Sequence, residues 1–344
     1  MGRTCGTAYD WLIVTPVTVR VPAKINLQLS VGPLRDDGYH DLVTVFHAVS
    51  LFDEVTVRPA ERSTVRVTGQ DAAAVPANRA NLAARAARAL ATSLRRKAKS
   101  AVQIEISKRI PASAGLAGGS ADAAATLVAC NELWGAGLSQ AELREVGAQV
   151  GSDVPFALLG GTAVGQGRGE RLTPALVTGT YHWVLAFAPG GLSTPEVYAA
   201  CDRLRAARAG AVEVTAGVAA GASHAAGQGT GSEQTAPAPT LSTELMAALR
   251  SGDPAAVGPL LSNDLQDAAV SLRPDLRKAL AEGRELGALG AIVSGSGPTC
   301  AFLAANARHA RELAVGLTGA GVCRGAVRAQ GPAGGAAVIA ADRE

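Results

Sequence analysis

The segment from Ile110 to Ala125 reads IPASAGLAGGSADAAA and is the most informative stretch of this 344-residue chain. It is a glycine-rich loop between two elements of different periodicity. Apolar and polar residues alternate from Val102 to Ile106, which predicts a strand, and apolar residues recur at helical spacing from Leu127 to Trp134. The loop is therefore expected to end at the N-terminus of a helix.

Such a loop is suited to binding phosphate. A helix N-terminus presents unpaired N–H groups and a partial positive charge, and glycines let the backbone approach an anion. The segment is not a P-loop, because Ser120-Ala121 rather than Lys-Ser or Lys-Thr follows Gly119, and a Rossmann fingerprint would open the first βαβ unit instead of lying past residue 110. From this segment alone, a phosphate site and a plain tight turn both remain open.

Length and composition limit the class of protein. A chain of 344 residues predicts two domains, each with its own core. The net charge is only +3 and the aromatic content 3%, so a nucleic-acid partner is disfavoured. The five cysteines form no C-x-x-C pair, a pattern typical of a reducing cytosol without structural zinc. Because no apolar run approaches the roughly 18 residues of a membrane span, we expect a cytoplasmic protein without a membrane partner.

The order of the expected elements predicts an α+β fold, because strands and helices mix without strict βαβ alternation. We expect a disordered extension at 1–16, a first domain at 17–178 and a second at 179–344, with a flexible insertion at 209–240. Further strands are expected at 42–50, 54–58, 182–188 and in two pieces within 291–302, and helices from about 81 and at 195–208, 241–250, 254–262 and 275–286. Ser139 and Glu142 have the spacing of a capping box.

The first strand carries the first candidate site residues. Apolar residues alternate with others from Val17 to Val31 without requiring a shift of register, although Pro22 indicates an edge position or a bulge. Four polar residues are expected on one face of this strand: Lys24, Asn26, Gln28 and Ser30.

Phosphoryl transfer needs charge neutralisation and a carboxylate that orients or accepts the hydroxyl proton. Asp153, at or beside a helix start, is the candidate carboxylate, although it could equally be an ordinary N-cap. Lys24 could stabilise that carboxylate and the transferring group, although a lysine on a strand is usually solvated. Asn26, on the same face, could hold Lys24 in place.

Other residues could bind substrate or metal. Gly38-Tyr39-His40 offers an aromatic plane and a ring with a donor and an acceptor, suited to gripping a heterocycle, or else it is a surface turn. Ser113 and Ser120 could reach phosphate or magnesium, and Ser120 could instead cap the helix.

Five ordered segments together are more specific than any one of them: PAKINL at 22–27, DGYH at 37–40, the loop at 111–120, GSDVPF at 151–156 and SGSGP at 294–298. They resemble the GHMP kinases, and the Lys-x-Asn and Gly-Tyr-His elements resemble the 4-diphosphocytidyl-2-C-methyl-D-erythritol kinases within that superfamily. The resemblance covers roughly 17–208 and 241–330. It implies a two-domain GHMP kinase fold, with a ribosomal protein S5 domain 2-like N-terminal domain, a ferredoxin-like C-terminal domain and the active site between them.

The resemblance also implies an activity and roles for residues. The activity is ATP-dependent phosphorylation of the 2-hydroxyl of the cytidyl-methylerythritol substrate, in the non-mevalonate route to isoprenoid precursors. Asp153 and Lys24 match the catalytic pair, and the substrate contacts match Asn26, Tyr39, His40, Thr194 and Tyr198, with the two tyrosines sandwiching the base and His40 on its edge. The loop matching the ATP phosphate site is Pro111, Ala112, Ser113, Ala114, Gly115, Leu116, Ala117, Gly118, Gly119 and Ser120, with Lys108 near the nucleotide and Ser120 the candidate Mg²⁺ ligand.

Some features depart from the family pattern, and others argue against rival functions. Alanines and Ser113 replace glycines common in the loop, which leaves phosphate binding by backbone amides intact and the magnesium ligands open. A homoserine or mevalonate kinase would have no base for Tyr39, His40 and Tyr198 to hold. A nucleotide sensor would not need both Asp153 and Lys24, and an RNA-binding protein is disfavoured by the weak charge. A monomer or weak homodimer is expected.

Overall fold

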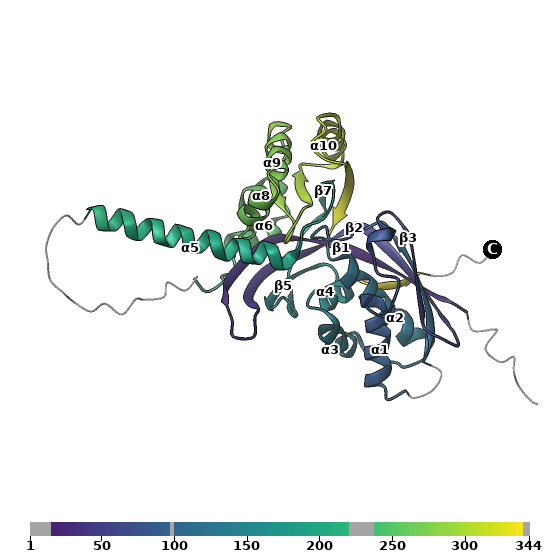
Figure 1. The fold of residues 1–344 in the computed structure, drawn as a ribbon. Coiled ribbons are helices and arrows are strands. Elements are labelled where there is room, and N and C mark those ends of the chain that lie inside the picture. The colour runs from purple at the N-terminus through teal and green to yellow at the C-terminus, as the bar shows by residue number, and fades with distance from the viewer. Residues whose placement is uncertain (1–14, 97–99, 220–236, 340–344) are drawn as a thin grey trace, which may run out of the picture.

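A computed structural model describes residues 15–96, 100–219 and 237–339. Two antiparallel-rich sheets with helices packed on them form a two-domain α+β architecture, as predicted (Figure 1). Nearly all of the expected extension at 1–16 lies outside the described residues. Within the described ranges, no helix combines the length and apolar character that crossing a bilayer requires.

The first sheet has eight strands, with the central order β12-β1-β2-β4-β3, and β5, β6 and β8 attached beside it. Their bounds are β1 Val17–Leu34, β2 His40–Pro59, β3 Thr64–Gly69, β4 Val102–Lys108, β5 Thr162–Gly167, β6 Arg171–Pro174, β8 Ser262–Asn263 and β12 Ala337–Ile339. The first four helical elements of this part are η1 Ala72–Ala74, α1 Leu82–Ser93, α2 Gly118–Leu133 and α3 Gln140–Val150, followed by the short α4 Val154–Leu159. Helix α2 packs against β1 and β2 and α4 against β1, and α1 and α3 pack on these two helices, so the four helices form one layer (Figure 1).

Local signals explain where these helices begin. The Asn81 side chain accepts a hydrogen bond from the Ala83 N–H and caps α1. The Ser139–Glu142 capping box forms as predicted and starts α3. Helix α2 is buried on almost all sides and is rich in alanine, which lets it lie close to the sheet.

The second sheet has the order β11-β7-β10-β9, with all pairs antiparallel. Numbered in chain order, these strands follow the arrangement 4-1-3-2, which confirms the ferredoxin-like C-terminal domain. Its strands are β7 Tyr181–Phe187, β9 Gly290–Val293, β10 Cys300–Ala304 and β11 Gly325–Gly331. Its helical elements are α5 Thr194–Ala219, α6 Thr243–Ser251, α7 Pro254–Val257, η2 Gly258–Leu260, α8 Gln266–Leu272, α9 Asp275–Glu285 and α10 Ala307–Gly319.

The chain crosses between the two sheets more than once. Strands β8 and β12 follow β7 in the chain, yet both pair with β1 in the first sheet. The two parts therefore share an extended boundary, and the division at residue 179 stays a prediction.

Strand β1 differs from its prediction. Its pairing with β2 shifts register between Pro22 and Ala23 and again between Asn26 and Gln28. A one-residue shift moves every later side chain to the opposite face. The expected polar face therefore ends at Asn26, and Leu29 instead lines the cleft described below. The expectation of an unbroken register was wrong, although a bulge beside Pro22 was anticipated.

Other elements also exceed their predicted bounds. The expected strands at 42–50 and 54–58 are one continuous β2. Helix α5 continues to Ala219, into the segment expected to be a flexible insertion, and projects from the body in Figure 1. Residues 220–236 of that segment lie outside the described residues. Where the segment expected to be an insertion ends, the Thr240 carbonyl accepts a hydrogen bond from the Gln28 side chain at 2.8 Å. The chain therefore packs on β1 at this point.

Candidate active site

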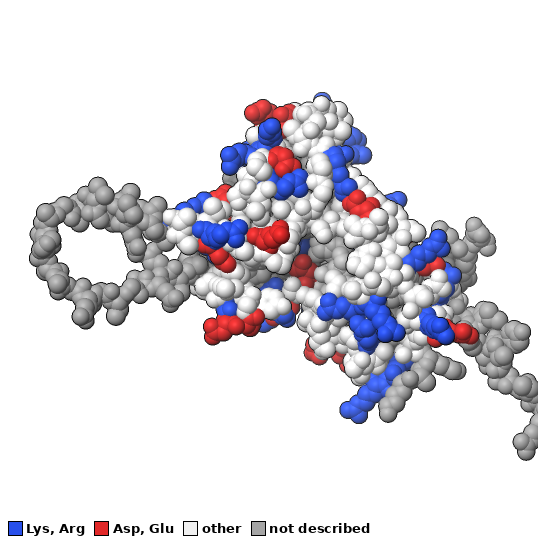
Figure 2. Space-filling model, in the orientation of Figure 1, with Lys and Arg blue, Asp and Glu red and all other residues white. Residues whose placement is uncertain are grey.

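A cleft of about 430 Å³ lies where the two sheets and their helices meet. This size falls within the usual range for small-molecule sites. Figure 2 shows the surface hollowed between the part that carries α8 to α10 and the part that carries α1 to α4. On the face shown, basic and acidic residues alternate over the part that carries α8 to α10, whereas basic residues gather over the region of α1 and α2.

The glycine-rich loop forms one wall of the cleft, and several of its carbonyl groups are already hydrogen-bonded. Four consecutive carbonyl oxygens accept hydrogen bonds from other parts of the chain. Ser113 accepts from the Leu192 N–H, Ala114 from the Thr299 N–H, Gly115 from the Ser294 hydroxyl, and Leu116 from the Lys24 N–H. The N–H side of the loop and the first turn of α2 is therefore the side left for an anion.

The backbone of the loop requires close packing at Gly115. This residue has φ +75°, and a Cβ there would lie 2.1 Å from the Ser294 carbonyl oxygen. Ala117, with φ 58°, is the N-cap residue of helix α2, and no side chain forms a capping hydrogen bond at this helix N-terminus. Ser120 therefore does not cap the helix, and it lines the cleft instead.

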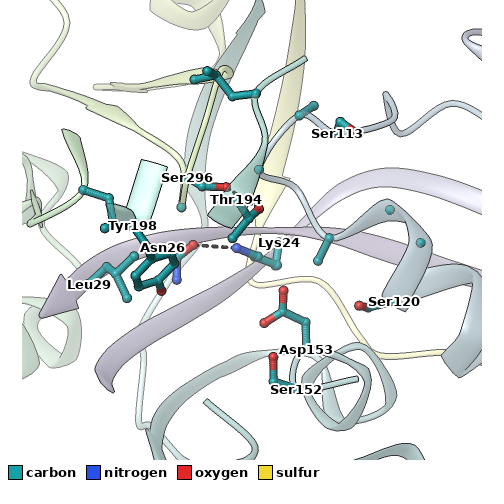
Figure 3. A pocket seen from close by; sticks show the side chains of 18 of the residues that line it. Lys24, Asn26, Leu29, Ser113, Ser120, Ser152, Asp153, Thr194, Tyr198 and Ser296 are labelled. Atoms are coloured by element: carbon teal, nitrogen blue, oxygen red, sulfur yellow. Dashed lines mark hydrogen bonds between the residues drawn. The ribbon is translucent and has the colours of Figure 1, made fainter. Parts of the chain in front are cut away.

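Asp153 and Lys24 face each other across the cleft (Figure 3). Asp153 is the N-cap residue of α4 by position, but its side chain makes no capping hydrogen bond. The alternative reading of this residue as an ordinary cap is therefore wrong. Its carboxylate is available to the cavity.

Lys24 is only 7% exposed, so it is not the solvated strand lysine that its position alone would suggest. Its ammonium donates to Asn26 Oδ1 at 2.6 Å and lies 5.6 Å from the centre of the Phe46 ring. Burial lowers the pKa of Lys24, and the negative charge of Asp153 partly opposes that shift. The ammonium and the carboxylate thus share one electrostatic environment.

Lys108 does not line the cleft. It is 2% exposed, and its ammonium forms ion pairs with the carboxylates of Asp53 and Asp122, the latter at 2.9 Å. Lys108 was predicted to bind the nucleotide, and this prediction is corrected. Lys108 lies beneath the loop, because a Cβ built on Gly118 would lie 3.1 Å from the Lys108 Nζ.

The aromatic residues lie at one end of the cleft. Tyr198 lines it and stacks on His40, with ring centres 5.1 Å apart and planes inclined by 29°. Tyr39 is 53% exposed, and the Arg168 guanidinium lies 5.2 Å from its ring centre. In this state Tyr198 packs on His40, and Arg168, which also lines the cleft, covers Tyr39.

The predicted site residues fall into two groups, those that line the cleft and those that do not. Those that line the cleft are Lys24, Asn26, Ser113, Ala114, Gly115, Ala117, Gly118, Gly119, Ser120, Asp153, Thr194 and Tyr198. Those outside its lining are Tyr39, His40, Lys108, Pro111, Ala112 and Leu116.

Sequence reasoning missed several lining residues, chiefly Arg168 and the apolar Leu82, Leu192 and Leu265. Ser296 lay in a recognised segment but was not proposed for the site. Its hydroxyl lies 2.9 Å from that of Thr194.

Comparison with known proteins places this architecture in a family. The model of the GHMP kinases N terminal domain matches residues 81–161, and that of the GHMP kinases C terminal domain matches 245–323. A 4-diphosphocytidyl-2-C-methyl-D-erythritol kinase from Mycolicibacterium smegmatis is 53% identical over 97% of this chain and 96% of its own length. The enzyme of that name from Nocardia farcinica is 52% identical over 95% and 98%.

Solved structures agree. A crystal structure of 4-(cytidine 5'-diphospho)-2C-methyl-D-erythritol kinase matches with a TM-score of 0.68 and 33% identity, covering 92% of this chain and all of the other. A homoserine kinase from Cytophaga hutchinsonii has a TM-score of 0.67 but 17% identity, and so shows the shared fold alone. This chain belongs to the 4-diphosphocytidyl-2-C-methyl-D-erythritol kinase family of the GHMP kinases.

Proposed function

We propose that this chain transfers the γ-phosphoryl group of ATP to the 2-hydroxyl of 4-diphosphocytidyl-2-C-methyl-D-erythritol, giving the 2-phosphate and ADP. The observation that carries the proposal is the uncapped Asp153 carboxylate facing buried Lys24 beside an amide-lined loop. Family membership supports the substrate and the pathway, the non-mevalonate route to isoprenoid precursors.

Asp153 accepts or orients the proton of the 2-hydroxyl as its oxygen attacks the γ-phosphorus. The bond from that phosphorus to the bridging oxygen breaks, and ADP leaves with the electron pair. Lys24 keeps the carboxylate ionised and offsets charge on the transferring group. Asn26, which accepts a hydrogen bond from Lys24, holds the ammonium in place.

The loop amides from Ser113 to Ser120 hold the ATP phosphates, and Lys108 supports them from beneath rather than by contact. Mg²⁺ fits the available donors, because the Ser120 hydroxyl and the Asp153 carboxylate line the same cleft. Mg²⁺ is usually bound through one or two carboxylates together with substrate phosphates and water. Consistent with that mode, the described residues contain no group of three or more His, Cys, Asp or Glu side chains suited to a metal. When bound, the ion neutralises phosphate charge.

The cytosine base is proposed to enter between Tyr39 and Tyr198, with His40 at its edge and Thr194 nearby. Opening that slot requires Arg168 to leave the face of Tyr39. The diphosphate of the substrate offers the displaced guanidinium a partner.

The described lining residues already bring Lys24, Asp153 and the glycine-rich loop together, and a monomer or weak homodimer is proposed. The four described cysteines, Cys130, Cys201, Cys300 and Cys323, are free thiols, which suits the proposed cytoplasmic location. The net charge of only +3 suits a protein without a nucleic-acid partner.

The test is an ADP-release assay on hydroxyl substrates with and without the cytidyl group. Asp153→Asn should bind both substrates but lose about 10²–10⁴ in kcat, the range typical of general acid–base groups. Glu61→Gln, which neutralises an exposed carboxylate between β2 and β3, is the matched control and should be unchanged. Near-normal turnover by Asp153→Asn would remove Asp153 from the chemistry.

A further inference from the structure

Lys24 and Asn26 belong to a longer chain of buried hydrogen bonds. The Lys24 ammonium donates to Asn26 Oδ1 at 2.6 Å, and Asn26 Nδ2 donates to the Thr44 hydroxyl oxygen at 2.8 Å. The Thr44 hydroxyl in turn donates to the backbone carbonyl of Gln28 at 2.6 Å. The chain therefore runs in one direction, from an ammonium to a backbone carbonyl.

The chemistry of the end groups fixes this direction. An ammonium can only donate and a carbonyl can only accept, so the two ends of the chain are determined. A hydroxyl has a single proton, and that of Thr44 is given to the Gln28 carbonyl. Thr44 can therefore only accept from Asn26, which turns the amide oxygen of Asn26 toward Lys24.

The position of Thr44 separates this role from substrate binding. Thr44 lies on β2, opposite Leu29 of β1 and Gly165 of β5, and is fully buried. It does not line the cleft. The register shift of β1 between Asn26 and Gln28 lies beside these bonds, so the acceptor carbonyl belongs to the first paired residue after the irregularity.

We infer that Thr44 is a positioning residue for phosphoryl transfer, because its hydroxyl fixes the orientation of the Asn26 amide that holds the Lys24 ammonium toward Asp153. This inference rests on the proposed role of Lys24. Without the hydroxyl, the Asn26 NH₂ group loses its buried acceptor and the amide is free to rotate. Lys24 then loses the oxygen that favours its charged form.

The decisive pair of variants is Thr44→Val and Thr44→Ser. Valine keeps the shape and removes the hydroxyl, whereas serine keeps the hydroxyl and removes the methyl group. We expect kcat to fall about tenfold in Thr44→Val and to stay within about threefold of wild type in Thr44→Ser, with both KM values within about threefold in each. Equal losses in the two variants, or no loss in Thr44→Val, would overturn the inference.

A second measurement does not depend on activity. The pH dependence of Lys24 acetylation by acetic anhydride, followed by peptide mass spectrometry, reports the protonation of the amine directly. Asp153, whose charge acts on Lys24, and Arg168, the other charged residue that lines the cleft, are unchanged in both variants. The titration of Lys24 should move to lower pH in Thr44→Val and remain as in wild type in Thr44→Ser.

The two measurements separate two failures. If wild-type protein releases no ADP with the cytidyl substrate, the proposed function is wrong, while the acetylation experiment still tests the link from Thr44 to Lys24. If wild type is active but the Lys24 titration is the same in all three proteins, the positioning role of Thr44 is wrong.

Discussion

The buried ion cluster of Lys108, Asp53 and Asp122 beneath the glycine-rich loop leads to a specific prediction, because its two carboxylates have different hydrogen-bond partners. Asp53 Oδ1 accepts from the backbone N–H groups of Arg109 at 2.6 Å and Ile110 at 2.8 Å, and Oδ2 accepts from Lys108. Asp122 accepts only from Lys108, and its Oδ1 has no hydrogen-bond partner among the described residues. Donors stabilise an ionised carboxylate, so the ionised group is Asp53 and the proton belongs on Asp122.

This assignment predicts that replacing Asp by Asn lowers the unfolding free energy by different amounts at the two positions. Burial raises the pKa of Asp122 to about 8, with Lys108 opposing the shift, so near pH 6.5 its carboxyl is neutral in the folded protein. Asp122→Asn then exchanges one neutral group for another of similar shape and should cost about 1 kcal/mol or less. Asp53→Asn removes a buried charge that pairs with Lys108 and two N–H groups, and should cost about 3–5 kcal/mol.

The pH dependence of the unfolding free energy provides a second test of this assignment. The pKa of Asp122 is higher in the folded protein than the ordinary 3.8, so between about pH 4 and pH 8 the folded state binds more protons than the unfolded state. Its contribution to stability is full below this window and is lost as pH rises, by at most about 1.4 kcal/mol per pH unit. From pH 6 to pH 8, wild type should therefore lose about 2 kcal/mol more unfolding free energy than Asp122→Asn.

Urea unfolding of wild type, Asp53→Asn and Asp122→Asn at pH 6, 7 and 8 measures both quantities. If the two variants are equally destabilised at pH 6, the assignment of the proton to Asp122 is refuted. Parallel stability curves for wild type and Asp122→Asn across this range would refute it independently.

Two further predictions concern the cleft. His40→Ala should weaken binding of the cytidyl substrate about tenfold and leave ATP binding unchanged in isothermal titration, because the ring that stacks on Tyr198 is lost; equal losses for both ligands would contradict the base-binding role. Gly115→Ala should lower stability by about 2 kcal/mol or more in thermal melts and weaken ATP binding, because the new Cβ would meet the Ser294 carbonyl at φ +75°. Its control is Gly319→Ala at the end of α10, where a Cβ meets nothing within 4 Å; similar losses in the two variants would contradict the packing argument.

Local signals predicted much of this molecule. The capping box at Ser139, the start of α1 at Asn81 and the helix after the glycine loop all depend on residues a few positions apart, and all three were predicted correctly. Asp153 and Lys24 were candidates from residue type alone, with ordinary structural alternatives open, and the resemblance to a family added the support for pairing them across 129 positions of sequence.

The features that the sequence did not predict share one physical reason, which is that each depends on contacts with residues far away in the chain. Both faces of β1 are buried, so alternation of apolar residues could not show where its register shifts. Lys108 was assigned to the nucleotide site from the resemblance, and no local signal showed its burial, because its partner Asp53 lies 55 residues earlier. Thr44 carries no local signal at all, since its partners are on another strand.

The cleft depends on contacts between the two domains as much as on either domain. The loop carbonyls are held partly by Leu192, Ser294 and Thr299 from the C-terminal part, so these contacts help to fix the orientation of the loop amides at the proposed phosphate site. The same C-terminal loop also limits Lys24, because a Cβ on Gly295 would lie 3.1 Å from its Nζ. The proposed phosphate site and the proposed catalytic ammonium of Lys24 are thus both contacted by one glycine-rich turn of the C-terminal part. A change that separates the two parts should therefore impair phosphate binding and the role of Lys24 together.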